Sequence, residues 1–150
     1  HFDEYAVSRR YYARPNIDIE NIKNYVESAK KAMRTGMFSC FAHPDLFMNG
    51  YHKWNEEVEQ LIYSLCLCAK ECDIPLEINA GGIRRGNTVV KEIGYQGYPN
   101  YNFFKIASEL GCKVIIGMDA HDPKHLNKED FQILEEFARE LNLNIITTLE

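Results

Sequence analysis

The chain has 150 residues and a formal net charge of −5 at neutral pH, with 45 % hydrophobic and 26 % charged residues. This composition is typical of a single soluble globular domain, here taken as residues 1–150, and its acidic balance argues against a nucleic-acid-binding protein. No apolar run approaches the ~20 residues that a transmembrane helix needs, so no membrane partner is expected.

The first half of the chain is predicted to contain two helices and two strands. Apolar residues recur at spacings of three and four over 18–35 and over 53–72, which predicts amphipathic helices. The apolar run 37–42 is typical of a strand and ends before Pro44, which cannot continue a central strand. A second strand is predicted over 76–80.

The second half continues the same alternation. Glycines place residues 81–100 in loops, two further helices are predicted over 101–110 and 128–141, and two strands over 114–118 and 143–147. Strands that alternate with helices of this length are typical of βα units, so the fold class is predicted to be α/β with a parallel sheet.

Five cysteines without paired spacing predict free thiols in a reducing, cytoplasmic environment. The first residue is His1 and not methionine. We therefore expect the chain to be cut from a longer protein.

Several polar residues directly follow predicted strands: His43, Arg84, Asp119 and His121. The carboxyl ends of parallel strands meet at one edge of a sheet or one rim of a barrel, and ligands bind there. We therefore expect these four side chains to converge, although they are far apart in the sequence.

Asp119 and His121 stand two residues apart, so in an extended segment both side chains point to the same side. A carboxylate and an imidazole suit Zn²⁺, Mn²⁺ or Fe²⁺, and His43 would add a ligand from a neighbouring strand, with Asp45 orienting its ring. The alternative is that Asp119 caps a turn and that both histidines are ordinary surface or strand-ending residues. His125 is interpreted as solvated, because Pro123 argues against a helix that would pair it with His121.

Arg84 follows two glycines in a loop that leaves a strand. Glycines let the backbone approach a ligand, and a guanidinium group matches phosphate oxygens, so a phosphate ester is the expected small-molecule substrate. The alternative is a flexible loop whose arginines meet solvent or surface acids.

Three stretches, 41-FAHPDL-46, 77-EINAGGIR-84 and 117-GMDAHD-122, resemble the polymerase-and-histidinol-phosphatase (PHP) metal phosphoesterases, and the histidinol-phosphatase type most of all. The resemblance implies a distorted (β/α)₇ barrel with up to three divalent metal ions (Zn, Mn or Fe). It also implies hydrolysis of L-histidinol phosphate in histidine biosynthesis.

Carried over residue by residue, the resemblance makes His43, Asp119 and His121 metal ligands, with His1 as a further one. Arg84 would face the substrate phosphate. Asp119, His121 and Arg84 would form the catalytic set, in which Asp119 either binds metal or shares a proton, and His121 either binds metal or assists the leaving alkoxide. The spacing of these residues leaves both roles open.

The sequence departs from the family pattern because the opening H-x-H pair, further histidines and a bridging glutamate are all missing. We therefore expect the C-terminal part of such a barrel, with open sheet edges through which copies could associate. Two alternatives are a non-catalytic PHP-like module that acts through association, and an unrelated metal-dependent hydrolase or aldolase with a similar barrel.

Overall fold

A computed structural model describes residues 17–51, 53–85 and 97–149. Its sheet has three parallel strands in the order β1 (Leu76–Asn79), β2 (Lys113–Gly117) and β3 (Asn144–Ile145). The prediction of an α/β fold with a parallel sheet is confirmed. The sheet is open within the described residues, and no barrel is shown.

The predicted helices are present with ends close to those expected. They are α1 (Ile19–Met33), α2 (Glu56–Glu71), α4 (Tyr101–Glu109) and α5 (Lys128–Glu140). Each begins after a residue whose side-chain oxygen accepts a hydrogen bond from a backbone amide of the first turn, which satisfies one of the free donors there. These capping residues are Asp18, Asn55, Asn100 and Asn127.

The strand predicted over 37–42 is wrong in its extent. Only Phe41 pairs with the sheet, through a parallel bridge to Leu76. Pairing stops there because the backbone of His43 turns into the left-handed region, with φ of 33°, and its amide donates to the Glu77 side chain instead of to a strand. The last strand is likewise shorter than predicted, two residues in place of 143–147.

The glycine-rich loop predicted from residue 81 begins as a short helix, α3 (Gly81–Arg84). The Asn79 side chain accepts a hydrogen bond from the amide of Gly81, which fixes the first turn. Two short 3₁₀ turns complete the described elements, η1 (Leu46–Asn49) and η2 (Pro123–His125). Residues 86–96, part of the predicted loop, lie outside the described residues.

The two faces of the sheet carry different residues. Leu76, Ile78 and Val114 are fully buried in one hydrophobic core to which α1, α2, α4 and α5 all contribute. Because side chains alternate along a strand, Glu77 and Ile115, which are paired in register, point away from that core. The described helices therefore cover one face of the sheet.

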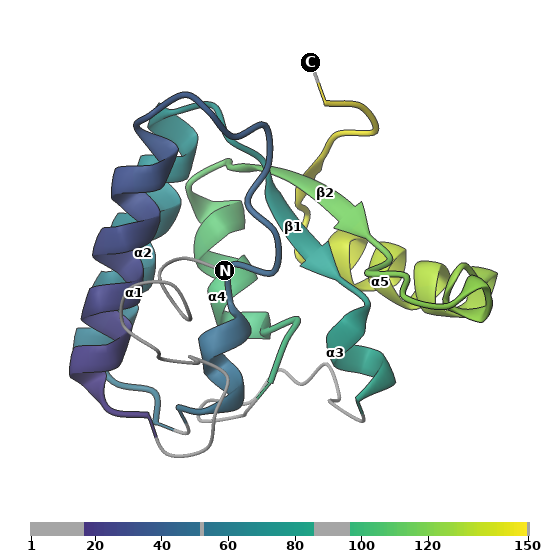
Figure 1. Cartoon of the computed structure of the whole chain (residues 1–150), viewed down its shortest axis with the longest axis horizontal. Helices are drawn as coiled ribbons and strands as arrows, with labels where there is room; N and C mark the ends of the chain where they lie inside the picture. The colour runs from purple at the N-terminus through teal and green to yellow at the C-terminus, as the bar shows by residue number, and fades with distance from the viewer. Residues whose placement is uncertain (1–16, 52, 86–96, 150) are drawn as a thin grey trace.

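Figure 1 shows α1 and α2 side by side, with α4 next to them, and α5 at the end of the view away from α1 and α2. The core continues between the last two helices, where the rings of Phe104 in α4 and Phe137 in α5 are 5.8 Å apart in an edge-to-face arrangement. None of the described helices combines the length and apolar character needed to cross a bilayer.

Candidate functional site

The polar residues of interest lie where the parallel strands end. His43 follows the Phe41 bridge, Asn79 ends β1, and Asp119 lies two residues after β2. Since Phe41 pairs with β1 and β1 pairs with β2, these three positions lie side by side at the carboxyl edge of the sheet. The parallel pairing of the strands is as predicted, and it puts His43 and Asp119 at the same edge.

Glu77 connects the first two of these segments. Its Oε2 atom accepts hydrogen bonds from the backbone amide of His43 and from the side-chain amide of Asn79, both at 2.9 Å. Its Oε1 atom lies over Gly117 so closely that a β-carbon at that position would collide with it. The carboxylate thus occupies the space that this glycine leaves open in β2.

Asn79 extends the connection to β2. Its side-chain oxygen accepts a hydrogen bond from the amide of Gly81 at 2.8 Å, and only 2 % of the residue is exposed. A β-carbon on Gly81 would collide with the Asp119 carboxylate. A continuous row of contacts therefore runs from His43 through Glu77 and Asn79 to Asp119.

Two residues at this edge have a backbone conformation that is uncommon for residues other than glycine. His43 has φ of 33° and Asp119 has φ of 47°. Asp73 and Asn142 also have positive φ, but they follow helix ends, where a left-handed residue ends the helix. His43 and Asp119 follow strand ends instead, and such local strain is often found at functional sites.

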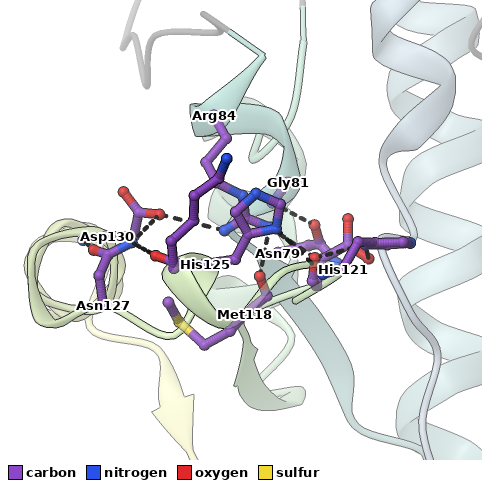
Figure 2. Close-up of polar contacts among 10 residues, drawn as sticks. Asn79, Gly81, Arg84, Met118, His121, His125, Asn127 and Asp130 are labelled. Carbon is purple, nitrogen blue, oxygen red and sulfur yellow. Dashed lines mark hydrogen bonds and ion pairs between the residues drawn. The ribbon is translucent and has the colours of Figure 1, made fainter.

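Arg84 is held by its own chain and reaches from α3 to the end of β2 and to α5 (Figure 2). One guanidinium nitrogen donates to the carbonyl oxygens of Met118 and Asp119, at 2.6 and 2.8 Å. The other lies 3.3 Å from an oxygen of Asp130, and both side chains of this ion pair are less than a fifth exposed. Arg84 is therefore close to Asp119, as predicted, and its contacts there are with backbone carbonyls.

His121 also lies beside Asp119. Its Nδ1 atom is 2.9 Å from the Asp119 carbonyl oxygen and 3.7 Å from the carboxylate, while three quarters of the side chain is exposed. The backbone amide of His121 donates to Nδ1 of His125 at 3.2 Å. His125 is partly exposed and accepts this bond, and the 3₁₀ turn η2 begins at Pro123, so His121 and His125 do not pair along one helix.

Asp45 is fully buried close to this edge. One carboxylate oxygen accepts a 2.6 Å hydrogen bond from the amide of Asn100, while the other has no hydrogen-bond partner within the described chain. Burial raises the pKa of Asp45 to about 7, partly offset by the bond from Asn100. Asp45 therefore contacts the start of α4. The ring of His43 lies next to that of Tyr98 in an edge-to-face arrangement, with the ring centroids 6.3 Å apart.

These contacts bring His43, Asp119, His121 and Arg84 to one edge of the sheet. Across residues 17–51, 53–85 and 97–149, however, no three His, Cys, Asp or Glu side chains are grouped closely enough to hold a metal ion. His1, the fourth predicted ligand, lies outside the described residues. The described part thus supplies a polar edge without a complete set of metal ligands.

Glu77 and Asn79 are contributors that the sequence reasoning did not single out. They stand two residues apart at the end of a strand, the same spacing that drew attention to Asp119 and His121. Two polar residues in alternation within an apolar strand were the signal that could have found them.

In comparisons with models of known protein families and with curated proteins, nothing matches the chain.

Proposed function

We propose that the chain forms part of a metal-dependent phosphoester hydrolase of the PHP type, which acts on a small phosphate ester such as L-histidinol phosphate. The observation that carries this proposal is the row of contacts from His43 to Asp119 at the carboxyl edge of a parallel sheet. Both end residues have strained backbones that follow strands, where an active site is expected in α/β folds.

The finer architecture in this proposal is the C-terminal portion of a distorted (β/α)₇ barrel. In a barrel wall the helices lie on one side of a parallel sheet, and the other side faces the interior. The described helices share one core on one face of the sheet, while Glu77 and Ile115 point to the other. This arrangement supports a barrel wall over a doubly wound sheet, which has helices on both faces.

His43, Asp119 and His121 would hold the divalent ion, with His1 as a further ligand. Their donor atoms suit zinc, manganese or iron, and three quarters of the His121 side chain is exposed, so an ion from solvent can reach it. A bound ion would polarise the phosphoryl group and activate a water molecule. Because the described residues contain no group of three ligands, we expect tight binding to require ligands beyond them.

Arg84 would contribute positive charge at this edge. Its bonds to the carbonyl oxygens of Met118 and Asp119 hold the peptide groups on both sides of Asp119. For Arg84 to contact a phosphate directly, the guanidinium would have to release Asp130 or use its remaining donors. The role of Arg84 that these contacts support is therefore to position Asp119.

Metal titration followed by assay of phosphate release from L-histidinol phosphate tests the proposal. The chain is loaded with Zn²⁺, Mn²⁺ or Fe²⁺, and bound metal is quantified after gel filtration. Replacing Asp119→Asn or His43→Ala should lower metal affinity by roughly 10–100-fold or more, because each change removes a donor. Asp73→Asn is the matched control, since this exposed acid lies just before β1, at the opposite end of the strands.

Equal metal binding by the wild-type chain and the Asp119→Asn and His43→Ala variants, with no phosphate release, would contradict the proposal. A non-catalytic PHP-like module is then the second candidate. The open sheet and the exposed apolar side chains Leu126 and Ile145 favour association with another chain or copy. Light scattering over a range of concentrations would reveal association of copies.

A further inference from the structure

Two of the five cysteines lie against each other although 46 positions separate them. Cys66 lies in α2, and Cys112 directly precedes β2. The Cys112 thiol donates a hydrogen bond to the backbone carbonyl oxygen of Cys66, with a sulfur–oxygen distance of 3.3 Å. Two oxidisable thiols therefore lie near each other, one in a helix and one at the start of a strand.

We propose that Cys66 and Cys112 form a reversible disulfide when the protein meets a peroxide, and that this bond fastens α2 to the start of β2. The Cys112 thiolate attacks one oxygen of hydrogen peroxide, the O–O bond breaks, and hydroxide leaves a sulfenic acid on Cys112. The Cys66 sulfur then attacks the Cys112 sulfur. The S–S bond forms, the S–O bond breaks, and the hydroxyl group leaves with the Cys66 proton as water.

The environments of the two thiols assign the first step to Cys112. The neighbouring Cys66 side chain lowers the pKa of Cys112, and the positive charge of Lys70 acts in the same direction. Burial raises the pKa of Cys66 well above its usual value. Since the thiolate is the reactive form, Cys112 reacts with peroxide and Cys66 resolves the product.

Access to Cys112 comes through the turn between α4 and β2. Cys112 is 1 % exposed, but its neighbour Gly111 is exposed and has φ of 68°. Lys70 closes over this turn, with its ammonium nitrogen 2.6 Å from the carbonyl oxygen of Leu110. We expect local opening of this short surface turn to expose Cys112 while the core stays folded.

Cys68 and Cys72 are an internal control for this chemistry. Cys68 lies in α2 and Cys72 caps its end, four positions later, so both residues lie on one face of the same helix. Helical side chains four positions apart hold their β-carbons about 5–6 Å from each other, and a disulfide needs about 3.5–4.5 Å. This pair should not close while the helix is intact, whereas Cys66 and Cys112 belong to different elements.

The test is oxidation of the folded 150-residue chain with hydrogen peroxide, followed by alkylation and peptide mapping by mass spectrometry without reduction. We expect a peptide pair joined through Cys66 and Cys112 that disappears after dithiothreitol. Cys68→Ser should leave it unchanged, Cys66→Ser should abolish it, and Lys70→Gln should slow its formation several-fold. Oxidation should also raise the Tm of the wild-type chain by roughly 5–10 °C, and not that of Cys66→Ser.

The proposal is overturned if Cys66 and Cys112 both remain open to alkylation in urea after peroxide treatment of the folded chain. A linked peptide that joins Cys68 to Cys72 instead, or linkage of Cys66 to Cys112 only when peroxide is added in urea, overturns it as well. All three outcomes are read from the wild-type chain, so they do not depend on the folding of any variant.

Discussion

The two faces of β1 differ in their side chains and in the contacts that these side chains make. On one face, Leu76 and Ile78 are fully buried and pack with the helices. On the other, Glu77 and Asn79 make hydrogen bonds to the segment after Phe41 and to the start of α3. Four consecutive residues thus serve both the core and the polar edge.

This difference shows that one face of the sheet mainly stabilises the fold, while the other face carries the polar groups of the candidate site. Burial of apolar side chains supplies most of the free energy of folding, and the helix-covered face has nearly all of that burial. The polar face adds positions for charged groups at the carboxyl edge, where apolar packing is not required. Substitutions on the two faces should therefore have separable effects on folding and on ligand binding.

The largest expected effect comes from the covered face. Ile78→Ala removes a fully buried side chain at the centre of the core and should reduce the free energy of unfolding by about 2–5 kcal/mol. Its neighbour Glu77→Gln keeps the size of the side chain and an acceptor oxygen, and should cost less than about 1 kcal/mol. Urea denaturation of both variants measures the difference, and equal losses would contradict the division into two faces.

The fold class was predictable from the sequence because periodic apolar residues determine which side of a helix is buried. The stripe with Val58, Ile62 and Leu65 predicts α2, and these residues are fully buried in it. Strand ends were less predictable, because pairing at Phe41 depends on the left-handed turn at His43, which no local pattern indicates. The start of α3 was missed because it depends on a hydrogen bond from Gly81 to a side chain.

The candidate site was predictable in part. The positions of His43 and Asp119 on one edge follow from the parallel alternation of strands and helices, and the structure has this arrangement. The partners of Arg84 were not predictable, because Met118 comes near it through the pairing of β1 with β2, and Asp130 through the packing of α5. A spacing rule identifies which residues end strands, but it does not say which atoms they contact.

Asp45 is a fully buried carboxyl group that accepts a hydrogen bond at the start of α4, so it extends the comparison to an acid inside the protein. Burial raises its pKa from the usual 3.8 to about 7, so the folded chain binds this proton more tightly than the unfolded chain. Its stabilising contribution is fully present below about pH 4 and is lost as pH rises through about 7. Wild-type stability should therefore fall over this range, relative to Asp45→Asn.

The variant cannot ionise and keeps an oxygen that can accept from the amide of Asn100. We expect Asp45→Asn to gain on the order of 3 kcal/mol relative to wild type between pH 4 and pH 8, which urea titrations at several pH values would measure. If the two profiles of stability against pH run parallel, Asp45 has the same charge in the folded and unfolded chains at each pH. A buried acid would then be tolerated in the core without neutralisation, which contradicts the expected penalty for a buried charge.

The smallest expected effect tests contact between neighbouring strands on the polar face. Gly117→Ala places a β-carbon against the Glu77 carboxylate and should destabilise the chain by about 1–3 kcal/mol. In a Glu77→Ala background the same change should be neutral or stabilising by up to ~1 kcal/mol, because alanine restricts the unfolded chain more than glycine does. A double-mutant cycle measures this change of sign. If Gly117→Ala costs the same in both backgrounds, Glu77 does not lie over β2, and the row of contacts from His43 to Asp119 is interrupted there.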